Sequence, residues 1–212
     1  MLLMLSAALA ADKTLDVSLG LAYWRLGVSG QVKPGLVIDM PWQKEGDLLL
    51  GSAALKPQLD ISASPAFARV GGRLRFEPMA MLDITPYVYG TQYFGNFQTV
   101  VGYDSWDALY GDNDTIAAYV EEEPTRQSTG RGVHVGTNAT LKAKAGPAIL
   151  MVNGDLSRWW VDGSVADDHA YFFEREWEVM MRLGPEGGDS LFMLNGALLY
   201  ETCSDGMTRR IV

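Results

Sequence analysis

The stretch VHVGTNATLKAK, residues 133–144, indicates the fold of this chain because its residues alternate between apolar and polar. Val133, Val135 and Leu141 share one parity, and His134 and Lys142 share the other. Successive side chains of a β-strand point to opposite faces of the sheet. The period of two therefore predicts a strand with one apolar and one polar face. A tilted strand needs roughly 9–11 residues to cross the hydrocarbon core of a bilayer, and this stretch is long enough.

The same alternation recurs elsewhere in the chain. It predicts strands near residues 15–23, 66–76, 82–89, 133–144, 148–157, 171–183 and 192–200, with an eighth strand beginning at residue 207. Aromatic pairs stand at the ends of two of them, as Tyr93-Phe94 and Trp159-Trp160. Aromatic girdles of this kind mark the two membrane–water interfaces of transmembrane barrels.

The predicted connections alternate between short and long. Residues 77–80, 145–147 and 184–189 are tight turns with Pro or Gly, whereas residues 29–64, 95–130, 162–170 and those from 203 onward are longer and polar. Outer-membrane barrels have short periplasmic turns and longer extracellular loops. The sequence therefore predicts an all-β fold, an antiparallel up-and-down transmembrane β-barrel of about 8 or more strands, over residues 11–212.

The composition narrows the class of protein. The chain has 212 residues, of which 48% are hydrophobic and 20% charged, a length that suits one domain. No run of about 18 apolar residues is present, which excludes an ordinary transmembrane helix. The net charge of −9 argues against nucleic acid as a partner.

Both ends of the sequence carry signals. Residues 1–10 are short and apolar, and Ala8-Leu9-Ala10 has the small-x-small pattern of a signal-peptidase site, so we expect a partial signal peptide and export. The basic segment that normally begins such a peptide is missing. The chain closes on Ile211-Val212 rather than on an aromatic residue. These two departures favour a truncated barrel.

Together these features resemble bacterial outer-membrane β-barrel proteins as a broad class. The resemblance rests on the export segment, on alternating strands such as residues 15–21, and on the aromatic strand ends. It implies a place in the outer membrane of a Gram-negative cell envelope, contact with membrane lipid and lipopolysaccharide, and insertion by the barrel assembly machinery. It is a resemblance of pattern and transfers no functional residue.

Charged residues on the polar parity are the candidate site. We expect them to line the lumen: Arg69, Arg73, Arg75, Lys142, Lys144, Asp83, Asp155, Glu174, Glu176 and Glu178. One interpretation is an internal salt-bridge network, which the balance of signs favours. The other is a charged channel lining that selects ions. Strand number decides between them, because side chains just fill a barrel of about eight strands.

The sequence contains no nucleotide-binding, serine-hydrolase or zinc-protease motif. We therefore expect no enzyme, no cofactor and no metal, and an outer-membrane barrel with a structural role or a passive channel role for small solutes or ions. One alternative is an outer-membrane enzyme acting on lipid or peptide at the extracellular rim, where His169 beside Asp168 resembles an omptin-type protease in composition only. Another is a soluble exported barrel that binds a small apolar ligand, as lipocalins do.

Overall fold

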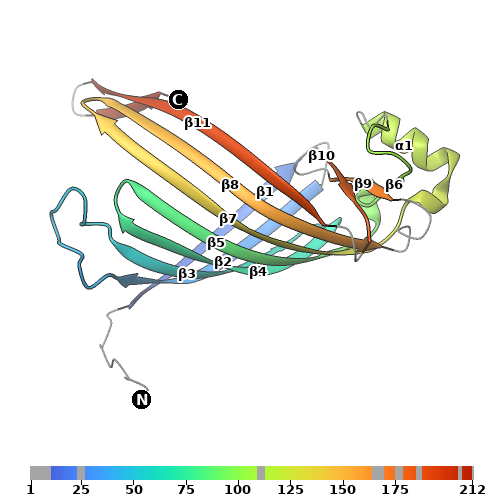
Figure 1. Cartoon of the computed structure of the whole chain (residues 1–212), viewed down its shortest axis with the longest axis horizontal. Helices are drawn as coiled ribbons and strands as arrows, with labels where there is room; N and C mark the ends of the chain where they lie inside the picture. Colours follow the sequence, from blue (N-terminus) through green and yellow to red (C-terminus); the bar gives the residue numbers. More distant parts are fainter. Residues whose placement is uncertain are drawn as a thin grey trace, which may run out of the picture.

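A large, strongly curved antiparallel sheet dominates the computed structural model of the chain (Figure 1). The structure describes residues 11–22, 27–108, 113–163, 170–174, 179–184, 188–204 and 207–211. Among these residues the main sheet has nine strands, which follow one another in chain order as an up-and-down meander. They are β1 (Ala11–Ala22), β2 (Gly27–Asp39), β3 (Ala54–Ala63), β4 (Phe67–Met79), β5 (Leu82–Tyr93), β7 (Gly130–Ala145), β8 (Ala148–Gly163), β11 (Asp189–Ser204) and β12 (Met207–Ile211).

The main sheet is open. Its pairing runs from β1 at one edge to β12 at the other, and over the described residues no pairing joins these two edges. The all-β antiparallel class predicted from the sequence is confirmed, whereas the closed barrel is not found.

Two strands of the main sheet, β2 and β3, occupy residues that the sequence pattern assigns to a long loop over 29–64. Pro34 and Pro57 argue against central strands there, because proline cannot donate a hydrogen bond to a neighbouring strand. The connection between β2 and β3, residues 40–53, lies at the same end of the sheet as the β4–β5 turn, since the Ala80 amide donates to the Leu49 carbonyl over 2.8 Å. The predicted strict alternation of short and long connections is therefore wrong. We call this end the turn end.

The predicted strand over 171–183 is also wrong. The described residues of this stretch form two short paired strands, β9 (Tyr171–Glu174) and β10 (Val179–Arg182), in a separate small sheet with β6 (Gly102–Tyr103). Helix α1 (Asn113–Glu122) and the 3₁₀ turns η1 (Asn96–Gln98) and η2 (Pro124–Arg126) accompany that sheet. Figure 1 shows these elements, which we call the cap, at the end of the main sheet opposite the turn end.

Apolar burial explains why the cap leaves the main sheet. Phe172 and Met181 are buried in a cluster with Phe67, Trp159 and Val161 of the main sheet. The Gly184 amide donates to the Val161 carbonyl over 2.8 Å and ties the cap to β8. A second cluster, Val101, Tyr103 and Ile116, joins β6 to α1. The concave side of the sheet is thus filled with apolar side chains at the cap end.

In the described part of the chain, no helix is both long enough and apolar enough to span a membrane.

Candidate functional site

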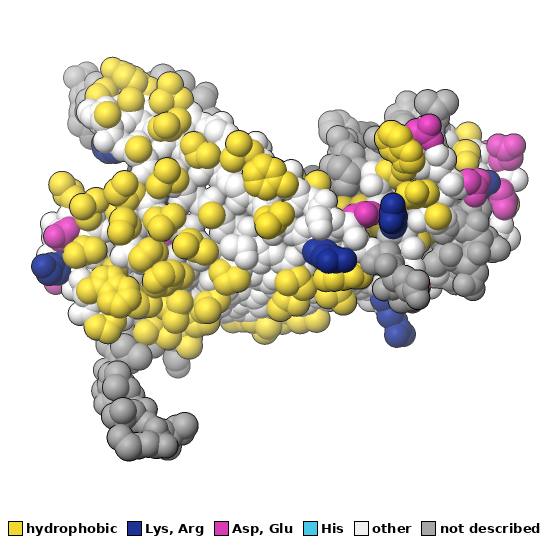
Figure 2. Space-filling view, viewed as in Figure 1, with side chains coloured by type: hydrophobic (Ala, Val, Ile, Leu, Met, Phe, Trp, Pro, Cys, Tyr) yellow, Lys and Arg dark blue, Asp and Glu magenta, His cyan; other side chains and the backbone are white. Residues whose placement is uncertain are grey.

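The two faces of the main sheet differ in polarity as the alternation predicts. Leu74 on β4 and Leu194 on β11 point to the convex face and are 40% and 65% exposed. Their neighbours of opposite parity, such as Arg73, point to the concave face and are half-buried. Exposed apolar side chains of the convex face include Val32, Leu36, Leu59, Ile61, Val70, Val88, Val133, Val135, Leu141, Leu150, Leu156, Phe192, Leu198 and Tyr200. Figure 2 shows hydrophobic side chains spread over the main sheet, with acidic side chains gathered over the cap.

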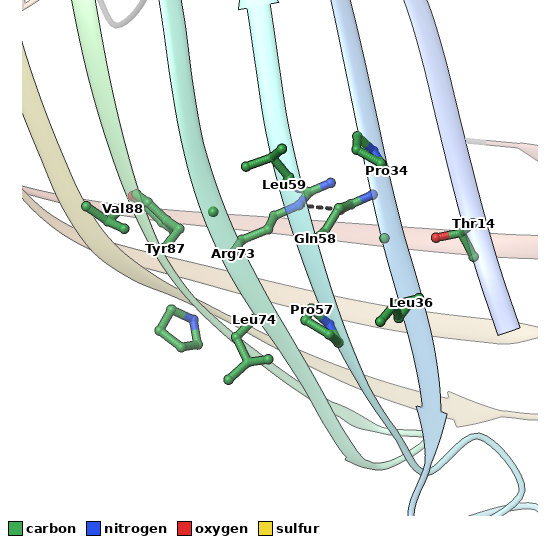
Figure 3. A pocket seen from close by; sticks show the side chains of 13 residues that line it. Thr14, Pro34, Leu36, Pro57, Gln58, Leu59, Arg73, Leu74, Tyr87 and Val88 are labelled. Carbon is green, nitrogen blue, oxygen red and sulfur yellow. Dashed lines mark hydrogen bonds between the residues drawn. The ribbon is translucent and has the colours of Figure 1, made fainter. Parts of the chain in front are cut away.

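The convex face carries an apolar hollow of about 900 Å³ over β2–β5 (Figure 3). Its lining is mainly of the outward parity, with Pro34, Pro57 and Leu74 among the residues that Figure 3 labels. Gly72 lies between Leu59 and Val88 in the register of the three strands and carries no side chain to fill the space.

The concave face encloses a polar cavity of about 720 Å³. The charged side chains of its lining are Lys33, Lys56, Asp60, Arg69, Arg73, Arg75, Asp83, Lys142 and Asp155. The rest of the wall is made of neutral polar groups, chiefly Gln31, Gln58, Thr85, Tyr87, Tyr89, His134, Asn138 and Thr140, and of the apolar residues Leu36, Val37, Pro57 and Met151.

Ion pairs hold the turn-end part of this wall together. The Glu77 carboxylate is 2.7 Å from Lys56 Nζ and 2.7 Å from the Arg75 guanidinium. Arg75 also pairs with Asp83 on the next strand. Glu77 and Asp83 are 8% and 7% exposed, and a buried carboxylate is stable only with cationic or hydrogen-bonding partners. The pairs therefore link β3, β4 and β5.

A chain of hydrogen bonds crosses the middle of the wall. The Tyr87 hydroxyl donates to Asp155 over 2.8 Å and lies 3.1 Å from His134 Nε2. The His134 ring stacks on Trp159, with 3.6 Å between ring centroids. Tyr87 fits there because Gly136 lies beside it: a Cβ atom on Gly136 would be 2.5 Å from the Tyr87 hydroxyl oxygen. Three strands, β5, β7 and β8, each contribute to this chain.

A pair of side-chain amides lies next to it. Asn138 and Asn153 donate to each other's carbonyl oxygen over 3.0 and 2.8 Å, and Asn153 also donates to Thr140 over 2.7 Å. Polar groups of β7 and β8 thus satisfy one another within the wall.

The wall formed by β2, β3 and β4 carries Arg73 and Asp60. Arg73 Nε donates to the Gln58 amide oxygen over 2.6 Å, drawn as a dashed line in Figure 3. Asp60 accepts from the Gln31 amide over 2.8 Å and is 3.9 Å from Lys33 Nζ.

The structure brings together six of the ten candidate residues predicted from the sequence. Arg69, Arg73, Arg75, Lys142, Asp83 and Asp155 line the cavity. Lys144 is exposed at the turn end of β7. Glu174 was also expected in the lumen, but it lies on β9 of the cap sheet rather than on a strand of the main sheet. Glu176 and Glu178 lie outside the described residues.

Three charged residues of the cavity were missed by the sequence reading. Lys33, Lys56 and Asp60 come from β2 and β3, which were predicted as loop. A signal existed, since Lys56, Gln58 and Asp60 alternate with Leu55, Pro57 and Leu59.

Within the described ranges no group of three His, Cys, Asp or Glu side chains is placed to hold a metal ion. His169 and Asp168, named above for the protease-like alternative, lie outside those ranges, as does the expected signal segment 1–10. Comparison of the chain with protein-family models, with curated proteins and with solved structures finds no match.

Proposed function

We propose that the chain is an outer-membrane protein of the β-strand type, whose main sheet lies in the bilayer with its convex face against lipid. The exposed apolar convex face is the observation that carries this proposal. Soluble monomers rarely expose contiguous apolar patches larger than a few hundred Å². Here large aliphatic side chains are exposed on strand after strand, for example Val70, Leu156 and Leu198 at 55%, 60% and 68%. Charged side chains of β4 and β8 within the same band, such as Arg73 and Asp155, point the other way.

The height of the apolar band supports the same function. Along β8 the outward-facing positions from Ala148 to Leu156 are uncharged, and the next one is Arg158. At about 3.3 Å per residue and a tilt of about 40°, such a segment rises roughly 20–25 Å, close to the apolar band of known barrels. The Arg158 guanidinium lies 5.1 Å from the ring centroid of Trp160. An arginine and a tryptophan together suit the boundary between lipid and water.

The polar concave face weighs against a soluble barrel that holds an apolar ligand. Such a barrel would direct its large aliphatic side chains inward, whereas here Leu156 and Leu194 point outward and Asp155 and Arg73 inward. In the proposed orientation the cap, which is built from the longer connections, lies on the extracellular side and the turn end on the periplasmic side.

We place a structural or binding role ahead of free passage of solutes. The apolar cluster of Phe67, Trp159 and Phe172 fills the concave side at the cap end. Passive conduction is the second candidate because of the polar cavity below that cluster, and it would require the cap to move.

Envelope fractionation tests the membrane assignment. We expect the full chain, expressed with an intact signal sequence, to remain in the outer-membrane fraction after washing with urea, and to migrate differently on SDS gels before and after boiling. A folded protein recovered from the soluble periplasmic fraction, with one mobility, would overturn the proposal.

A pair of variants tests contact between the convex face and lipid. Leu194 stands opposite Gly154 in the register, within the apolar band, and Ser190 stands opposite Arg158 at its boundary. Leu194→Arg should lower the free energy of unfolding from lipid vesicles by about 2–4 kcal/mol, and Ser190→Arg by about 0–1 kcal/mol. If the convex face is in water, both variants should stay within about 0.5 kcal/mol of the parent.

A further inference from the structure

We propose that the concave cavity, in the membrane protein proposed above, binds a small molecule bearing phosphate or carboxylate groups. The net charge of the cavity lining is opposite in sign to the net charge of the whole chain. Six cationic and three acidic side chains line it over the described residues, an excess of three positive charges, whereas the whole chain has a net charge of −9. Counting the buried Glu77 behind the wall still leaves an excess of two.

The carboxylates of the wall already have partners within the protein. Glu77 and Asp83 accept from Lys56 and Arg75. Asp155 accepts from the Tyr87 hydroxyl over 2.8 Å, which is a neutral donor. The acids therefore act as internal acceptors of the wall, and the charges of Arg73 and Lys142 can attract an anion that enters the cavity.

Arg73 is the residue best placed to bind that anion. Its Nε atom donates to Gln58 over 2.6 Å, which fixes the plane of the guanidinium against β3. Gln58 is a neutral amide rather than a carboxylate, so this hydrogen bond leaves the positive charge of the guanidinium uncompensated. A planar guanidinium held in this way matches two oxygens of a carboxylate or phosphate at once. Lys33 and Lys142 line the same cavity from β2 and β7.

Size and access fit a small ligand. The cavity of about 720 Å³ falls within the range of roughly 300–1,000 Å³ typical of small-molecule sites. The apolar cluster around Phe172 and Met181 fills the cap end, so a ligand reaches the cavity through the part of the concave side that this cluster leaves open. Lipid on the convex side lowers the surrounding dielectric, which strengthens attraction between a cation and an anion in the cavity.

Calorimetric titration of the full chain, folded in neutral detergent micelles, tests the site. The probes are sodium pyrophosphate, citrate and, as a cation of opposite sign, spermidine. We expect one site that binds the two anions and not spermidine. Arg73→Gln should weaken anion binding at least tenfold. Arg73→Lys should weaken it less, because lysine keeps the positive charge although it cannot donate two parallel hydrogen bonds. Arg158→Gln, on the convex face, is the matched control and should leave the Kd within twofold.

A titration with short-chain phosphatidic acid distinguishes the two sources of phosphate. Tighter binding than pyrophosphate, lost in Arg73→Gln, identifies a lipid headgroup as the ligand, and weaker binding identifies a free anion. Absence of anion binding, equal weakening in Arg73→Gln and Arg158→Gln, or preferential binding of spermidine would each overturn the inference. Heat-modifiable mobility shows that each variant is folded. An embedded protein without anion binding refutes only the site, and a soluble protein that binds anions through Arg73 refutes only the membrane assignment.

Discussion

The contact between Gly136 and Tyr87 predicts a large effect from a single added methyl group. In Gly136→Ala the new Cβ would lie 2.5 Å from the Tyr87 hydroxyl oxygen and 2.6 Å from its Cζ atom. Because real carbon contacts are about 3.4 Å or longer, the ring has to move. Moving it breaks the 2.8 Å hydrogen bond to Asp155 and the 3.1 Å contact with His134.

The expected loss of stability follows from these two effects. Overpacking of a filled site costs roughly 1–3 kcal/mol, and a hydrogen bond to a charged acceptor contributes about 1.5–3 kcal/mol. We expect Gly136→Ala to lower the free energy of unfolding by about 3–5 kcal/mol. Gly154→Ala is the matched control in the neighbouring strand, because the nearest atom to its new Cβ is 3.9 Å away. It should change the stability by less than about 1 kcal/mol.

Urea unfolding from lipid vesicles, followed by tryptophan fluorescence and by gel mobility, measures both variants. A double-mutant cycle isolates the cause. In a Tyr87→Ala background the same Gly136→Ala change should cost at least about 1.5 kcal/mol less than in the parent. The ring it collides with is then gone, and only the 2.9 Å approach to the Leu156 carbonyl oxygen remains. If Gly136→Ala costs the same in both backgrounds, or is as mild as Gly154→Ala, the packing of Tyr87 against Gly136 is refuted.

Three further changes test the cap and the turn end. Arg126 donates to Asp104 over 3.2 Å and to the Gly102 carbonyl over 3.3 Å. Arg126→Gln should therefore destabilise the cap by roughly 1–3 kcal/mol. We expect faster proteolysis near α1 and an unchanged unfolding transition of the main sheet. Phe172 is fully buried, so Phe172→Ala should cost about 3–5 kcal/mol in the cap, and unchanged protease resistance of the cap would contradict its burial. Backbone hydrogen bonds from Leu50 and Leu49 lower the pKa of Asp47. The hydrogen bonds from Asp47 therefore stabilise residues 40–53 above the ordinary pKa of an aspartate, and this stabilisation is lost as the pH falls through the lowered pKa of Asp47. Amide exchange of Leu49 and Leu50 should become faster in that pH range. Asp47→Asn should abolish this pH dependence.

Alternation in the sequence predicted the faces of the strands that the structure shows. Arg73 and Leu74 point to opposite faces, as do Asp155 and Leu156. This part is predictable because the face on which a side chain lies depends only on its parity along the strand. The inward position of His134 follows from the same rule.

Two parts of the fold were not predictable in this way. Pro34 and Pro57 obscure β2 and β3, and partners from neighbouring strands, unseen in a local pattern, hold these residues in the sheet. Over 171–183 the alternation predicts a single strand, which would place Phe172 and Met181 on opposite faces. In the structure these two residues lie on two short paired strands and are both buried beside β8.

The partners within the site were hidden for a related reason. Tyr87 and Asp155 are 68 residues apart in the chain, and their contact depends on the register of three strands. Register is set by turn geometry and by long-range pairing, so parity places both residues on the same face without saying that they touch. The gap at Gly136 that admits the Tyr87 ring carries no signal of its own in the sequence.

The two parities of each strand face surroundings of different kinds, and substitution should be tolerated accordingly. On the convex face of the proposed membrane protein, Val133, Val135 and Leu141 contact fluid lipid, which has no fixed shape. Substitution of one aliphatic residue by another should therefore be tolerated at these positions. One position along, His134 and Gly136 meet neighbours at fixed distances, where few residue types are compatible. Freedom and constraint therefore alternate residue by residue along β7, with the same period of two that its polarity follows.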